Sequence, residues 1–157
     1  MGDAEIDIEV DASGLEVLVP DECMALVRQG SVGRVVFTSA ALPAVLPVNY
    51  VVDDDGAILL RTGSQTRLAS AAGAVVAFEV DDISMTSGSW SVVVTGRVTV
   101  VRDPDARARI DALGLRPWVR SRRDLALRIA PELVTGRRLP TEPALLDPLE
   151  GAGLQAG

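Results

Sequence analysis

The chain has 157 residues, a formal net charge of −7, one cysteine and neither histidine nor lysine, so all fifteen basic residues are arginine. These counts exclude a Ser-His-Asp triad, a His-ligated metal, a lysine Schiff base, a cysteine-held cluster and an internal disulfide. The length fits one domain, the acidic balance argues against a nucleic-acid partner, and any redox chemistry requires a bound organic cofactor.

Residues 1–18 carry six acidic side chains and no basic one, and we interpret them as an acidic extension. The alternation in residues 5–11 predicts an edge strand, with a solvated tail as the alternative. This start lacks the basic and apolar regions of a signal peptide, and every apolar stretch is interrupted before the ~20 residues of a membrane span. Together with the single cysteine, these features predict a cytoplasmic protein without a membrane contact.

Residues 20–29 predict a helix. Pro20 suits the first helical position, acidic residues follow at the positive end of the helix dipole, and Gly30 suits the end. Cys23 lies within this helix, three positions from its start, where we expect a buried and unreactive thiol.

From residue 32 the pattern changes to short strands joined by turns, which predicts a mainly antiparallel barrel or sandwich. Gly33 indicates a bulge or a close contact, and Asp55-Gly56 is the tight corner of a hairpin. Pro43 and Pro47 each remove a backbone donor, so their strand must expose an edge or carry bulges. The predicted strands are 32–39, 42–52, 57–62, 74–82, 90–103 and 125–131.

Two further helices are expected, one over 65–72 with Ser64 as its N-cap and one over 104–113. The last residues, 140–157, are rich in proline, glycine and alanine, and we expect them to be disordered. The folded domain is therefore expected over 19–139.

The stretch LLRTGSQTRLAS, residues 59–70, combines a strand end, a small polar turn and a helix start, with an arginine on either side. Backbone N–H groups at such a turn, together with arginine, are suited to holding a phosphate group. The alternative is an ordinary strand end, in which Arg61 pairs with Glu79 or Asp81 across the barrel.

Six segments in a fixed order carry a resemblance: GRVVF, PAVLPVNYVV, LLRTGSQ, VVAFEVDDI, WSVVVTGRV and VTGRRL. They resemble the pyridoxamine 5′-phosphate oxidase-like split-barrel flavoproteins, in particular the small bacterial branch, over residues 20 to 139. The resemblance implies a six-stranded antiparallel Greek-key split barrel with a few short helices. It also implies a homodimer that holds FMN in a groove at the dimer interface.

The resemblance assigns three groups of cofactor-binding residues, beside the flavin ring, at its phosphate and near the dimer groove. Gln65 stands where the family usually has a phosphate-binding lysine, and Arg67 can supply a replacement cation. A second departure is the loop Gly88-Ser89-Trp90, where the family usually has Gly-Trp. The full set is Val48, Asn49 and Tyr50 at the ring, Arg61, Thr62, Ser64, Gln65 and Arg67 at the phosphate, and Trp90 and Ser91 at the groove.

Two other features have open interpretations. Trp118, followed by three arginines, indicates a surface anchor or a substrate lid. Arg137 and Arg138 indicate an anion clamp, which would reach a phosphate or a partner's acidic tail, or a solvated pair.

The resemblance implies an FMN-dependent oxidoreductase, of the flavin reductase or nitroreductase kind, that moves electrons from NAD(P)H to a small acceptor. The lack of histidine and lysine agrees with this reaction, because the cofactor carries the chemistry. The alternative is a non-catalytic carrier of flavin or of the deazaflavin F420, or a dimeric scaffold, and the Gln65 departure favours it. No metal site is expected.

Overall fold

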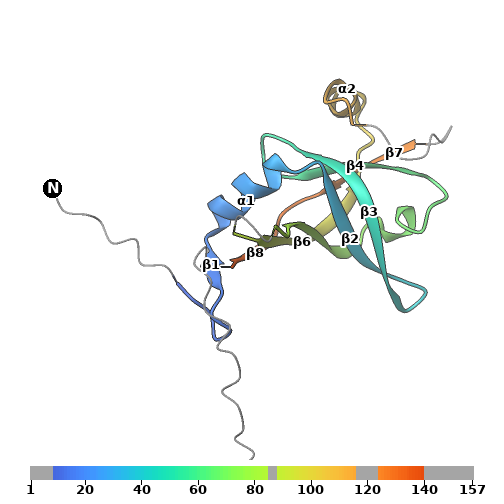
Figure 1. Cartoon of the computed structure of the whole chain (residues 1–157). Coiled ribbons are helices and arrows are strands. Elements are labelled where there is room, and N and C mark those ends of the chain that lie inside the picture. The colour runs from blue at the N-terminus through green and yellow to red at the C-terminus, as the bar shows by residue number, and fades with distance from the viewer. Residues whose placement is uncertain (1–8, 85–87, 116–123, 140–157) are drawn as a thin grey trace, which may run out of the picture.

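The computed structural model describes residues 9–84, 88–115 and 124–139 (Figure 1). Within these ranges it contains eight strands, two α-helices and one 3₁₀ turn. In chain order the elements are β1 (Glu16–Leu18), α1 (Pro20–Gln29), β2 (Val32–Ser39), β3 (Leu42–Val52), β4 (Ile58–Gly63), η1 (Ala69–Ala71), β5 (Val75–Asp82), β6 (Trp90–Val100), α2 (Pro104–Ala112), β7 (Asp124–Ile129) and β8 (Leu133–Arg138).

Strands β2 to β7 close into a six-stranded antiparallel barrel. The strand order is β6-β5-β2-β3-β4-β7, and the pairing of β6 with β7 joins the two ends. The long strand β6 pairs with β7 near its C-terminal end and with β8 over Trp90–Thr95, so β8 and then β1 extend the sheet beyond the barrel. The predicted split-barrel fold class is confirmed.

Alternate residues of each strand point into the barrel, and apolar side chains occupy these inward positions. Gly33 lies so close to the Phe78 ring that a Cβ at this position would be 2.4 Å from it, which confirms the predicted close contact. Tyr50 packs edge-on against Phe78, with the ring centroids 4.8 Å apart. The N-terminal half of β3 pairs with β2 and β4 joins only from Tyr50, so Pro47 lies in a part of β3 with one paired edge, as predicted.

Helix α1 packs against β3, β6 and β8, and α2 covers the outer surface of β4 and β7 (Figure 1). Cys23 on α1 is fully buried, and burial raises the pKa of its thiol, as expected for an unreactive cysteine. Asp103 caps α2 by accepting a hydrogen bond from the Ala106 N–H at 2.8 Å. Within the described ranges, neither helix is long and apolar enough to cross a membrane.

The structure corrects two predictions. The helix expected over 65–72 is wrong, because turns occupy residues 64–68 and only η1 is helical. Ser64 is therefore not an N-cap, and the Thr66 hydroxyl instead accepts a hydrogen bond from the Ala69 N–H at 3.3 Å. Strand β8 was not predicted, because Gly136 and two arginines leave its sequence without clear alternation.

Some predictions fall outside the described residues, namely those on residues 1–8, on Trp118 and on 140–157. Part of the predicted edge strand is described, since Val10 forms an isolated bridge with Glu16. Strand β1 lies inside the range assigned to the acidic extension.

Candidate functional site

The turn that follows β4 is fixed by hydroxyl groups of two threonines. The Thr66 hydroxyl donates to the Gly63 carbonyl at 2.9 Å and lies 2.7 Å from the Thr62 hydroxyl, which is buried. The Thr66 N–H also donates to the Gly63 carbonyl, at 3.1 Å. These hydrogen bonds fix the backbone of the turn, and the Ser64 hydroxyl makes no hydrogen bond within the described part of the chain.

Arg61 lies on the outer surface of β4 and contacts two carboxylates. Its guanidinium forms an ion pair with Asp111 of α2 and lies 3.8 Å from the Asp124 carboxylate at the start of β7. The Arg61 side chain is only 16% exposed. The predicted alternative partners were wrong, because Glu79 and Asp81 pair with Arg34 instead.

Gln65 and Arg67 are both exposed in the turn. The Arg67 Nε donates to the Ser39 hydroxyl at 3.3 Å, which links the turn to the end of β2. Among the described residues, Arg67 has no carboxylate within ion-pair distance. Arg67 is therefore a cation that no carboxylate of the described residues neutralises.

Strand β3 separates from β4 just before this turn. Strands β3 and β4 are paired from Val52, opposite Ile58, to Tyr50, opposite Leu60. Beyond this paired region the next residues are Asn49 on β3 and Arg61 on β4. The side chains of Val48 and Tyr50 are buried in the barrel. The Tyr50 hydroxyl donates to the Val27 carbonyl, and burial raises its pKa to about 12.

Trp90 and Ser91 lie at the start of β6, away from the turn. In the sheet order β5 and β2 stand between β6 and β3, so at about 4.8 Å per strand β6 lies about 14 Å from β3 along the curved sheet. Ser91 and Arg137 line a shallow cavity of about 260 Å³ on the outer surface of β6 and β8. One chain thus brings the turn and β3 together, but not β6.

Arg137 and Arg138 pair with carboxylates of the N-terminal part of the chain. Arg137 Nε lies 2.7 Å from Asp11, and Arg138 lies 3.2 Å from Glu16 and 2.6 Å from Glu22. Hydrogen bonds from Ser13 and Arg137 lower the pKa of Asp11 to about 2. The two arginines are thus held by acids of their own chain.

A separate cavity of about 550 Å³ lies under α2, and none of the predicted cofactor-binding residues lines it. Leu59 and Ile110 form part of its apolar floor, and Asp53 and Arg128 form an ion pair at its rim. Asp53 begins the turn whose corner was predicted at Asp55-Gly56, and its carbonyl accepts from the Gly56 N–H at 3.1 Å. The cavity itself could not be predicted, because its walls come from elements that are distant in the sequence.

The motif order, the closed barrel and the turn after β4 can now be compared with known proteins. The family model described as pyridoxamine 5′-phosphate oxidase matches residues 20–138. The chain belongs to the pyridoxamine 5′-phosphate oxidase family. This membership confirms the resemblance found in the sequence.

The chain is also similar to individual known proteins. An uncharacterized protein of Mycobacterium tuberculosis is 46% identical over 126 residues, which is 76% of this chain and 82% of the relative. The FAD binding protein of Mycobacterium smegmatis is 35% identical, with a TM-score of 0.69 over 78% of this chain and 97% of its own. A protein of unknown function from Corynebacterium diphtheriae is 29% identical, with a TM-score of 0.69 over 80% of this chain and 98% of its own.

The carboxylates that hold Arg61 were missed by the sequence analysis. Asp111 and Asp124 lie 50 and 63 positions after Arg61, and no local spacing links them. The docking of α2 on β4 brings Asp111 to Arg61, and the pairing of β7 with β4 brings Asp124 to it.

Proposed function

We propose that the chain is a flavin-dependent oxidoreductase that binds FMN where β3 and β4 separate and transfers electrons from NAD(P)H to a small acceptor. The observation that carries this proposal is the turn after β4, where Arg67 has no ion pair with a described carboxylate and β3 has just separated from β4. The mycobacterial relative described as an FAD binding protein supports a flavin as the ligand class.

The residues present fit a phosphorylated flavin. The Ser64 hydroxyl, the Gln65 amide and the Arg67 guanidinium are donors on one turn, and a phosphate accepts hydrogen bonds from all three types. The backbone of β3 at Val48 to Tyr50 would face the polar edge of the ring. Because the Tyr50 side chain lies in the core, its contribution would come from the backbone.

When bound, the flavin supplies the hydride and electron chemistry that this chain's side chains lack. The protein would fix the phosphate through the turn, direct backbone N–H groups to the ring and limit the access of water. No side-chain acid or base is required for this role. The absence of histidine and lysine is therefore compatible with activity.

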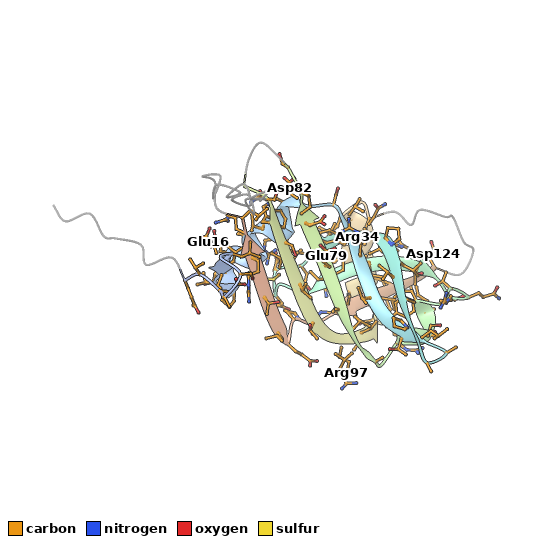
Figure 2. The ribbon with its side chains drawn as sticks, turned by 60° about the horizontal axis from the view of Figure 1, so that its bottom comes forward. Glu16, Arg34, Glu79, Asp82, Arg97 and Asp124 are labelled. Atoms are coloured by element: carbon orange, nitrogen blue, oxygen red, sulfur yellow. The ribbon has the colours of Figure 1, made fainter. Side chains whose placement is uncertain are left out.

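We also propose that the functional unit is a homodimer. The outer surface of β8-β6-β5-β2-β3 carries exposed apolar side chains, with Val45 55% and Leu133 58% exposed, and Arg34 and Glu79 form an ion pair within it (Figure 2). Exposed apolar groups on one sheet face are typical of interfaces. A second copy on this face would allow its Trp90 and Ser91 to approach the flavin, which a single chain does not allow.

A reduction assay tests the oxidoreductase proposal. Protein loaded with FMN is mixed with NADH or NADPH without oxygen, and the visible flavin absorbance is followed before and after air is admitted. Loss and recovery of the absorbance at rates above those of free FMN are expected. Unaltered absorbance of bound flavin would contradict catalysis.

Gln65 supports a second candidate, a non-catalytic carrier of flavin or F420, because losing the lysine weakens the phosphate site. A charge-assisted contact of about 1.5–3 kcal/mol corresponds to a loss of about tenfold to a hundredfold in affinity. Tighter binding of F420 than of FMN, without turnover, would favour this candidate.

A further inference from the structure

Arg61 and Arg67 lie on the same segment, but the net charge of each arginine together with its described neighbours differs in sign. Arg61 faces Asp111 and Asp124, so one positive charge meets two negative charges. Arg67 faces a neutral Ser39 hydroxyl, and no described carboxylate pairs with it. A phosphate brought to Arg61 would meet a net negative charge, whereas at Arg67 it would meet a net positive charge.

The contacts of Arg61 have a second consequence, for the docking of α2. Ile110 is the buried residue of this helix, and it packs with Leu59 of β4 and Ala126 of β7 in a small apolar cluster. Such limited apolar packing provides a weak attachment by itself. The Arg61–Asp111 pair joins the same two elements, and Arg107 adds a hydrogen bond to the Asp124 carbonyl at 3.4 Å.

The geometry of Arg61 also limits what it can offer a ligand. Its Nε is buried and has no hydrogen-bond partner among the described atoms, and its side chain is mostly covered. An anion at Arg61 would have to displace at least one carboxylate. Arg67 requires no such displacement, because its guanidinium is exposed beside the ordered Gly63–Thr66 turn.

We propose that Arg67 supplies the charge that recognises the flavin phosphate, and that Arg61 is a positioning residue that holds α2 on β4. The assignment of Arg67 rests on the proposed flavin site, whereas the assignment of Arg61 does not. Specificity for a phosphorylated flavin then depends on a residue two positions after the one at which the family usually has lysine.

The experiment compares two matched variants, Arg67→Gln and Arg61→Gln, each of which removes one positive charge from the segment. FMN and riboflavin are titrated separately, because the ratio of their affinities isolates the phosphate contact. Arg67→Gln should lower FMN affinity about tenfold or more, leave riboflavin affinity unchanged and reduce the ratio. Arg61→Gln should leave the ratio at the wild-type value. If the ratio of FMN affinity to riboflavin affinity falls in Arg61→Gln and stays at the wild-type value in Arg67→Gln, the assignment is wrong.

Asp111→Asn tests the same assignment by removing a negative charge instead of a positive one. If Arg61 held the phosphate, removal of the competing carboxylate would tighten FMN binding; our assignment predicts an unchanged FMN affinity. Amide hydrogen exchange in α2 should become faster in both Asp111→Asn and Arg61→Gln, and remain at the wild-type rate in Arg67→Gln. Unchanged exchange in the first two variants would overturn the positioning role of Arg61.

These readouts separate failure of this inference from failure of the proposed function. If wild-type protein binds neither FMN nor riboflavin, the proposed function fails, and the exchange data still decide the role of Arg61. The role of Arg67 is then decided by titrating inorganic phosphate while following the amide resonances of residues 63–68. Shifts that vanish in Arg67→Gln would support an anion site, and absence of any shift would overturn it.

Discussion

Replacing Gln65 by lysine should tighten FMN binding, because it restores the cation that the family usually has at this position. Gln65 is exposed on the ordered turn, two residues before Arg67, and its side chain makes no hydrogen bond within the described residues. A lysine can therefore reach a bound phosphate without breaking an existing contact. The substitution adds charge and leaves the barrel interior untouched.

The expected gain in FMN affinity of Gln65→Lys is limited by the exposure of this position to solvent. A charge-assisted hydrogen bond contributes about 1.5–3 kcal/mol, and solvent screening at an exposed site reduces this to about 1–2 kcal/mol. The corresponding gain in affinity is about fivefold to thirtyfold. Because exposed charges are screened by salt, the gain should shrink at high ionic strength.

Quenching of flavin fluorescence measures the affinity of Gln65→Lys, with riboflavin as the control ligand and Gln65→Met as a matched variant without charge. Tighter binding of FMN alone, at low salt, is the expected result. Equal tightening of riboflavin would show that the phosphate is not involved. No change for either flavin would refute the placement of the phosphate at this turn.

Three further predictions concern stability. Tyr50→Phe removes a buried hydrogen bond and should cost about 1 kcal/mol, or about 2–4 °C in a thermal melt; an unaltered melting temperature would contradict the contact. Ala40 and Ala41 both have positive φ in a two-residue hairpin, so Ala40→Asn with Ala41→Gly should stabilise by about 1 kcal/mol in urea unfolding, and a loss of stability would contradict this. Folding lowers the pKa of Asp11 from 3.8 to about 2, so its contribution to the stability of the fold is present above pH 3.8 and is lost as the pH falls towards 2. Asp11→Asn should remove this part of the pH dependence of stability. An acid unfolding profile identical to that of the wild type would contradict the pairing with Arg137.

Most barrel strands could be predicted because one face of each is buried, so alternation marks them directly. Strand β8 escaped detection because Gly136 packs where a side chain would otherwise mark the inner face, with Cys23 Sγ 2.5 Å from where its Cβ would be. The Ala40-Ala41 corner carries none of the usual turn residues, and only the pairing of the flanking Ser39 and Leu42 shows that it is a two-residue hairpin.

The candidate site was predictable only in part. The strand end at Arg61 and the turn at Gly63 and Ser64 were correctly predicted from local composition, whereas Arg67 was expected in a helix and lies in the turn. The partners of Arg61 depend on where α2 docks, and the separation of β3 from β4 depends on barrel closure. These are properties of the tertiary structure, which local patterns do not encode.

The proposed function depends on the binding of a phosphorylated flavin by the turn after β4 and the β3 edge. The most direct measurement is the visible absorption spectrum of the purified protein, before and after incubation with excess FMN and removal of free ligand. We expect a flavin spectrum to remain with the wild-type protein after this treatment, or with the Gln65→Lys variant if the wild-type site is too weak. If both proteins stay colourless, the proposed flavin site is wrong.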